Sequence, residues 1–419
     1  MSTFPKLIRV RQNFSRPRPL DFAAALRAEF EKLRPHIAPG AKIAVGVGSR
    51  GITNLKPIVA EVLALVRAAG AEPFIFPAMG SHGGATPEGQ REILASYDIT
   101  EDSMRTPIRA SLEVKRVGVT PDGKPVWCSV EVLAADGIVL INRVKPHTDF
   151  SGDLGSGLLK MTVVGLGKRA GAAAMHLAAS ELGHERAIRT MAGVLIRETP
   201  LLGGVAILEN QFHETAKIVV LPRDEMEQGE DALLVEARRL MPLLPFNEID
   251  LLIVDRMGKN ISGTGMDPNV IMRSIDGYSS HLRRDGRPSP FIRRIFVRDL
   301  TPETHGNAIG IGLADLTTTR LARAMDPRIS FLNAMTALTP QSAKLPIYFD
   351  TDREAIERAL ASLPLADRAA AKIVRIADTL SLAEIEVSEA LWAEVKTRPD
   401  CTAIGEAREL KFDRESNLV

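Results

Sequence analysis

The sequence predicts an α/β protein of two domains, each built on a mostly parallel sheet. At 419 residues the chain is longer than one ordinary hydrophobic core supports. Short apolar runs alternate with helical stretches along it, which is the pattern of a parallel sheet covered by helices. A stretch rich in leucine and proline, residues 240–245, separates two such series. We therefore expect domains at residues 1–245 and 246–419, with an active site in the cleft between them.

The elements follow from the positions of apolar runs, caps and breaks. In the first domain, strands are expected at residues 42–47, 73–77, 137–142, 205–209 and 218–221, and helices at 52–69 and 170–182. A further helix is expected to open at Thr86, because Thr86 can cap it, Pro87 suits its first position and Glu88 its positive end. In the second domain, a strand at 251–255 precedes a glycine-rich loop at 258–265, and the runs 292–297, 355–363 and 371–376 repeat the α/β character.

The composition excludes several classes of protein. With 53 Lys+Arg against 52 Asp+Glu, the formal net charge is +1, so no basic field exists to hold nucleic acid or an anionic membrane. The two cysteines, Cys128 and Cys401, lack the paired spacing of a zinc site or a disulfide framework. We see neither a secretory signal nor an apolar stretch of roughly 18 residues that would span a bilayer. A cytoplasmic protein is expected.

The first candidate site is the turn Gly46-Val47-Gly48-Ser49-Arg50-Gly51. It follows a strand and precedes a helix, so it matches the dinucleotide-binding G-x-G-x-x-G pattern in letters and in context. The acid that should follow the second strand and hold a ribose is missing, because that strand ends in Phe76-Pro77. Three interpretations stay open: an NAD site, a tight turn without a ligand, and a site where backbone amides and Arg50 hold a carboxylate or phosphate.

The second candidate is His82, in the loop Gly80-Ser81-His82-Gly83-Gly84-Ala85-Thr86. The loop follows a strand, and ligands of open α/β sheets bind outside the carboxyl ends of strands. Flanking glycines let another molecule approach the backbone closely. A loop histidine bonded to a backbone carbonyl is the equally weighted alternative.

The third and richest stretch runs from Asn142 to His176. It contains His147, a glycine-rich loop from Ser151 to Gly157, Lys160 within an apolar run, and His176 in an alanine-rich helix. Such a loop can cradle a phosphate, with Lys160 as a charge or a nucleophile. A solvated surface lysine is the usual alternative, but the apolar neighbours of Lys160 favour a partly buried position. His176, taken alone, is more often a packed side chain than a ligand.

Other common catalytic motifs do not occur in the sequence. No histidines stand at H-E-x-x-H spacing, and His184-Glu185 is isolated, so a zinc hydrolase has no direct support. The sequence also contains no G-x-S-x-G elbow and no G-x-x-x-x-G-K-S/T loop. These absences lower the expectation of a serine hydrolase or a P-loop NTPase.

Taken in order, the candidate segments resemble the nickel-dependent lactate racemase family, which binds a nickel-pincer nucleotide. The first anchor is Gly80-Ser81-His82, followed by Thr86 and a helix from Glu88. The second is Pro146-His147, followed by a glycine-rich turn and Lys160, and the third is His176, sixteen residues after Lys160. The resemblance covers residues 40–180 well and the region 250–275 less clearly.

This resemblance implies an isomerase, a racemase or epimerase that inverts C2 of a 2-hydroxy acid by hydride transfer. By the family's pattern, Lys160 holds the cofactor covalently and His176 ligates nickel. His82 and His147 are the general bases on opposite sides of the substrate, a task suited to histidine because its ordinary pKa lies near neutrality.

The resemblance also implies binding roles and partners. The loop residues Gly155, Ser156 and Gly157 are expected to contact the cofactor, and Arg50 to grip the substrate carboxylate. Cofactor-biosynthesis proteins are the expected partners for loading.

The sequence departs from the family pattern where the substrate would bind. The aspartate that precedes the family's arginine is missing from Gly48-Ser49-Arg50. In the second domain Met272 and Ile275 stand where a glutamine and a lysine are expected, with Arg273 as a partial replacement in substrate binding. A larger 2-hydroxy acid, such as an aldonic acid, is therefore expected rather than lactate. Two alternatives remain: an NAD-dependent dehydrogenase using Gly46 to Gly51, and a non-catalytic relative that binds an organic acid or a nucleotide.

Overall fold

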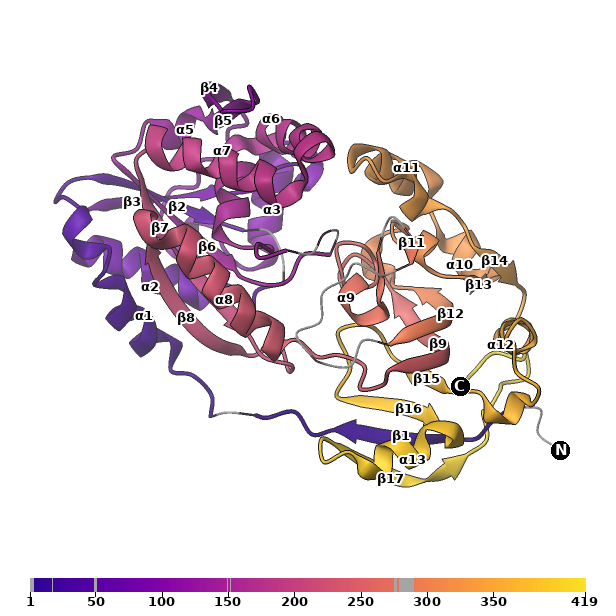
Figure 1. Ribbon diagram of the computed structural model, residues 1–419. Helices are drawn as coiled ribbons and strands as arrows, with labels where there is room; N and C mark the ends of the chain where they lie inside the picture. Colours follow the sequence, from indigo (N-terminus) through magenta and orange to yellow (C-terminus); the bar gives the residue numbers. More distant parts are fainter. Residues whose placement is uncertain are drawn as a thin grey trace. The chain divides into compact units, whose positions relative to one another are not determined.

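The computed structural model shows two compact α/β units (Figure 1). It describes residues 4–16, 18–48, 51–148, 150, 152–274 and 290–419, together with the backbone of 277–278. Unit 2 comprises Pro17–His147 and Gly152–Met241, and unit 1 comprises Met1–Arg16, Thr148–Ser151 and Pro242–Val419. The expected α/β class with mostly parallel sheets is confirmed.

Unit 2 is built on a five-stranded sheet with the strand order β3-β2-β6-β7-β8. Its strands are β2 (Lys42–Val47), β3 (Glu72–Pro77), β6 (Gly137–Arg143), β7 (Leu201–Glu209) and β8 (Thr215–Pro222). The first four strands in this order run parallel, and β8 is antiparallel to β7. All five lie where the apolar runs predicted strands, because parallel strands buried on both faces are almost continuously apolar. A separate hairpin joins β4 (Val114–Val119) and β5 (Pro125–Ser129).

Helices cover both faces of this sheet. On one face, alternate strand residues such as Val45 and Val139 share a core with Phe30 and Val62 from helices. On the other face, Leu158 packs so closely on Gly204 that a Cβ there would lie 2.7 Å from the leucine. The helices of unit 2 are α1 (Phe22–Phe30), α2 (Leu55–Ala68), α3 (Pro87–Ser96), α4 (Glu101–Met104), α5 (Val130–Leu133), α6 (Leu158–Leu182), α7 (His184–Glu198) and α8 (Met226–Leu240).

Helix α6 begins twelve residues earlier than the alanine-rich pattern predicted, at Leu158 instead of residue 170. Its glycines indicate a loop by composition, but in the structure they allow close packing. A Cβ on Gly165 would lie 3.0 Å from the Cβ of Ala78, and one on Gly167 would lie 3.1 Å from the carbonyl oxygen of Trp127. The close contact compensates for the low helix propensity of glycine. Among the described residues, no helix, α6 included, is long and apolar enough to cross a membrane.

Unit 1 is built on an eight-stranded sheet with the order β14-β13-β12-β9-β15-β16-β1-β17. From β14 to β15 the strands are parallel, and from β15 to β17 each neighbouring pair is antiparallel. The strands are β1 (Leu7–Gln12), β9 (Glu248–Met257), β12 (Phe291–Leu300), β13 (Leu316–Thr318), β14 (Ile347–Phe349), β15 (Ile373–Ile376), β16 (Glu384–Ser388) and β17 (Cys401–Arg408).

The remaining elements of unit 1 are short. They are the strand pair β10 (Arg273–Ser274) and β11 (Gly277–Tyr278), and the helices α9 (Pro268–Ile271), α10 (Thr319–Ala324), α11 (Pro327–Thr336), α12 (Asp352–Ala361) and α13 (Trp392–Thr397).

Strand β1 belongs to the sheet of unit 1, although the sequence analysis assigned residues 1–245 to the first domain. In Figure 1 this indigo strand lies between the yellow strands β16 and β17. Arg9 and Arg11 of β1 both bond Glu384 of β16, at 2.6 and 2.9 Å. The partners of β1 lie more than 370 residues away in the chain, so no local pattern could reveal the pairing.

Asp352, which is fully buried at the start of α12, is the centre of an ion-pair network in unit 1. Its carboxylate bonds Arg298 at 2.8 Å and Arg320 at 3.2 Å, and it accepts the backbone N–H of Leu418 at 2.8 Å. Arg298 pairs in addition with Asp255 at 2.8 Å. A buried carboxylate requires such partners because its desolvation is costly.

The substitution Asp352→Asn should destabilise unit 1 by about 3 kcal/mol, since it leaves two half-buried guanidinium groups without their shared charge. The chain has two tryptophans, Trp127 in unit 2 and Trp392 in unit 1, so urea unfolding of a Trp127→Phe protein reports unit 1 alone. Glu357→Gln on the same helix is the control and should leave the midpoint in place. An unchanged midpoint for Asp352→Asn would show that the network contributes little.

Candidate active site

Parallel strands of unit 2 end at one edge of the sheet, and the predicted site residues follow those ends. Strand β2 ends before Gly48, β3 leads to His82, and β6 leads to Lys145 and His147. Strand β2 lies between β3 and β6 in the sheet, so the strand that follows β2 in the sequence and the later strand β6 are placed on opposite sides of β2. Open α/β sheets bind ligands at such a switch point. The topology therefore gathers these segments at the edge where a ligand is expected.

His82 is half-buried in the loop between β3 and α3. As predicted, Thr86 caps α3, accepting the N–H of Gly89 at 3.1 Å. The glycines beside His82 have packing reasons of their own: a Cβ on Gly80 would lie 2.8 Å from Val164 of α6, and one on Gly83 would collide with the backbone of Gly89. The loop is thus fixed between α3 and α6.

Hydrogen bonds connect the residues that follow β6 with those that precede α6. Lys145 and Ser156 exchange two backbone hydrogen bonds of 2.8 Å. The side chain of Asn142 donates to the carbonyl of Gly157 at 2.8 Å. A Cβ on Gly155 would collide with the carbonyl of Lys145, so this position requires glycine for packing. These contacts fix where helix α6 begins, and with it Lys160 in its first turn.

Lys160 and His147 are in direct contact in this loop. The Nζ atom of Lys160 hydrogen-bonds Nε2 of His147, and His147 is 7% exposed. An ammonium group can only donate hydrogen bonds, so in this contact the imidazole nitrogen is an unprotonated acceptor. The structure thus places side by side the two residues that the family pattern assigns to the tether and to a base.

Burial holds the pKa of His147 well below its usual range, and the nearby charges of Lys160, His184, Lys145 and His176 act in the same direction. His147 and the four nitrogen-bearing side chains within its electrostatic reach thus form a group of five residues. His147 is neutral at physiological pH, in the form that accepts a proton. We call these five residues the nitrogen cluster.

His184 is a member of this cluster that the sequence analysis took as isolated. Its ring is stacked with that of His147, with the centroids 6.3 Å apart and the planes 30° apart. His184 is the first residue of α7, after the break at Gly183. Its position depends on the turn between α6 and α7, so the only signal in the sequence was its spacing of eight residues from His176.

Glu230 of α8 was also not anticipated. It is fully buried, and its Oε2 accepts the N–H of Leu159 at 2.9 Å, in the first turn of α6. A Cβ on Gly157 would collide with this carboxyl group. Burial raises the pKa of Glu230 to about 7, against the effect of the N–H groups of Leu159 and Leu158. The group therefore supports the start of α6, one residue before Lys160.

Of the two arginines predicted to bind substrate, the structure describes Arg273. Arg50 lies outside the described residues. Arg273 is buried in unit 1, where it bonds Asp315 at 2.6 Å and the carbonyl of Leu313 at 3.0 Å. These contacts give Arg273 a role in holding unit 1 together.

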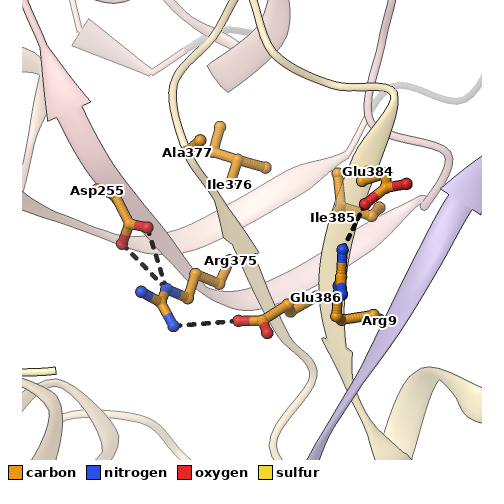
Figure 2. Close-up of a pocket in the computed structure, with 8 residues that line it drawn as sticks. All are labelled: Arg9, Asp255, Arg375, Ile376, Ala377, Glu384, Ile385 and Glu386. Atoms are coloured by element: carbon orange, nitrogen blue, oxygen red, sulfur yellow. Dashed lines mark hydrogen bonds and ion pairs between the residues drawn. The ribbon is translucent and has the colours of Figure 1, made fainter. Parts of the chain in front are cut away.

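Unit 1 contains a cavity of about 250 Å³ that is lined by paired charged side chains (Figure 2). Arg375 lies between Asp255 and Glu386, at 3.0 and 3.1 Å, and Arg9 pairs with Glu384. None of the predicted site residues that the structure describes lines this cavity. Its charges are paired with one another, so we assign it to the stability of the sheet.

The turn at Gly46–Gly51 differs from a dinucleotide site in two respects. A Cβ on Gly46 would lie 2.7 Å from Leu140 and 2.8 Å from Phe76, so this glycine is explained by packing inside the sheet. Helix α2 begins at Leu55, four residues after Gly51. In the dinucleotide fold the glycine turn opens directly into the helix whose N-terminus holds the pyrophosphate. Both observations count against the dinucleotide interpretation.

In the described part of the chain, no three His, Cys, Asp or Glu side chains are arranged to hold a metal ion by themselves. A metal held mainly by donors of an organic cofactor needs only one protein ligand. His176, half-buried on α6, is the residue that the family pattern assigns to this task.

Part of the chain is similar in sequence to a known domain, and its fold is similar to that of a solved protein. Residues 23–187 match the model of the lactate racemase N-terminal domain. No curated protein is significantly similar in sequence. Among solved structures, the lactate racemase apoprotein from Thermoanaerobacterium thermosaccharolyticum is similar with a TM-score of 0.53 and 13% identity, covering 90% of this chain and 99% of that one.

The matched domain contains His82, His147, Lys160, His176 and His184, so it includes both strand-end loops and the whole of α6. The fold is that of an α/β protein of the lactate racemase type. This N-terminal part of the chain is similar to the family whose motifs the sequence resembles.

The raised pKa of Glu230 gives a test of its burial. Above its unfolded pKa near 4.5 the unfolded chain loses a proton that the folded protein keeps, so Glu230 reduces stability progressively as pH rises from 4.5 to about 7. Relative to wild type, Glu230→Gln should gain stability on the order of 3 kcal/mol between pH 4.5 and pH 8. Urea unfolding followed by Trp127 in a Trp392→Phe background measures unit 2. Glu236→Gln on the same helix is the control; a pH-independent difference for Glu230→Gln would contradict the assignment.

Proposed function

We propose that the chain is a racemase or epimerase that inverts C2 of a 2-hydroxy acid, using a nickel-pincer nucleotide tethered to Lys160. The observation that carries this proposal is the contact between Lys160 and a buried, neutral His147 inside the nitrogen cluster. The two residues are 13 positions apart in the sequence, and their side chains are in contact in the described structure.

The nitrogen cluster suits such a cofactor. Its lysines and histidines offer positive charge and hydrogen-bond donors to an anionic nucleotide and to a substrate carboxylate. Neutral imidazole, as His176 would supply, is a donor that nickel accepts. His147 is also placed to accept the proton that Lys160 must lose before its nitrogen forms a covalent bond.

When bound, the cofactor supplies the acceptor and donor of the C2 hydrogen. The residues of the chain accept and return the proton of the substrate hydroxyl. His147, neutral because it is buried among positive neighbours, takes the proton of the substrate hydroxyl and returns it. His82, from the neighbouring strand end, does the same for the opposite face of the substrate. Arg50 holds the carboxylate.

The substrate that we propose is a 2-hydroxy acid larger than lactate, such as an aldonic acid. Met272 replaces a polar family residue, and Arg273, the candidate replacement, is engaged with Asp315 and backbone carbonyls of unit 1. The proposal places the enzyme in the cytoplasm, with the proteins that build and load the cofactor as its partners.

Co-expression with the cofactor-building enzymes tests the tether. The wild-type chain should gain the mass of the nucleotide at Lys160 and one nickel per chain, measured by intact-protein mass, peptide mapping and metal analysis. Lys160→Arg keeps the positive charge but cannot form the same covalent bond, so it should show neither the mass increase nor activity.

The substitution His147→Asn tests the role of His147 as a base independently of cofactor attachment at Lys160. It should keep the mass increase while kcat falls about 10²- to 10⁴-fold, the usual contribution of a general base. Full activity of wild-type protein that carries no added mass and no nickel would overturn the proposal.

A further inference from the structure

Lys168 is a buried lysine that the catalytic scheme above does not use. It lies within α6, eight residues from Lys160 and eight from His176, and only 1% of it is exposed. The helix is interrupted at this residue, whose backbone has φ 53° and ψ −151°. A non-glycine residue in this conformation is strained, so surrounding contacts must hold it. The break directs the lysine into the protein, and burial lowers the pKa of its ammonium group to about 8.

The partners of Lys168 explain why a lysine is present. Its Nζ donates to the carbonyl oxygen of Pro77 at 2.6 Å and to Oε1 of Gln90 at 3.2 Å, and it lies 5.8 Å from the centre of the Phe76 ring. Two of these partners are the last two residues of β3. The ammonium group thus fixes the end of the strand from which the His82 loop departs.

Gln90, on α3, completes this arrangement. It is fully buried, and its Nε2 is directed at the carbonyl oxygens of Met79, Gly80 and His82, at 3.2, 3.3 and 3.5 Å. Buried carbonyls need donors, and Gln90 supplies one to this loop, beside the N–H of Ala85 that bonds the carbonyl of His82. Lys168 in turn holds Oε1 of Gln90 and so decides which way the amide faces. Together the two side chains contact the backbone from Pro77 to His82.

We propose that Lys168, acting through Gln90, is a positioning residue that sets His82 relative to Lys160 and His176. One helix then carries the tether and the nickel ligand and, through its internal break, also controls the loop of a general base. Val164 and Ala172, on either side of the break, pack against Gly80 at distances that a Cβ would reduce to 2.8 and 3.0 Å, so the loop has little freedom to adjust. This inference rests on the proposed function for the role of His82, but the placement of the loop can be tested without it.

The test uses Lys168→Met, which keeps the length and apolar character of the side chain and removes the donors. In the unloaded protein, hydrogen exchange of the amides at residues 78–86 should become about tenfold faster or more, with the rest of unit 2 unchanged. Gln90→Leu should have the same effect, and the double variant should be no worse than either single one, because both act through one network. The exposed Lys115→Met is the matched control.

In the loaded enzyme, Lys168→Met should lower kcat about 10²-fold, the effect of displacing a catalytic group by about 1 Å, while KM changes less than threefold. Faster exchange throughout unit 2, or unchanged exchange in the loop, would overturn the inference, because the lysine would then only fill the core or be dispensable. If the loop loosens as expected but loaded wild-type protein does not invert 2-hydroxy acids, the positioning holds and the proposed function fails.

Discussion

Helix α6 lies so close to Ala78 and the Trp127 carbonyl that a Cβ atom at Gly165 or Gly167 would come within 3.0 or 3.1 Å of them, tighter than ordinary van der Waals contact. This close approach determines much of unit 2. Larger residues at these positions would push the helix away from the sheet, and Lys160 at its start and His176 further along would move with it. The same approach brings Val164 and Ala172 against the loop of His82. The glycines therefore serve the site through the packing of the helix.

The distribution of charge around the nitrogen cluster is a second feature that defines the candidate site. The positive and neutral nitrogen groups of the cluster lie at the strand ends, whereas the buried carboxyl group of Glu230 lies behind the start of α6. The first N–H groups of a helix have no partner within the helix, and Glu230 accepts that of Leu159, which is a reason for it to occupy this position. On the side of the cluster, burial and like charges keep His147 unprotonated. An anionic ligand that enters there meets donors and positive charge.

Local patterns predicted the five strands of the unit 2 sheet, the strands β9, β12 and β15 of unit 1 and the cap at Thr86, because periodicity and capping are properties of neighbouring residues. The pairing of β1 with β16 and β17, the support of α6 by Glu230 and the stacking of His184 on His147 depend on contacts between distant segments. The early start of α6 was missed for another reason: glycine indicates a loop by composition and close packing by environment. The sequence did not indicate that Lys168 is buried, because its burial depends on the break in α6.

Under the proposed function, the C2 hydrogen of the substrate is carried as a hydride while the histidines move only the hydroxyl proton. The most direct measurement follows racemisation of lactate and of a longer 2-hydroxy acid, each deuterated at C2, by the loaded enzyme in ordinary water. The inverted product of the true substrate should retain deuterium at C2. Replacement of that deuterium by hydrogen from water at the rate of inversion would contradict it, because C2 would then be deprotonated by an ordinary base.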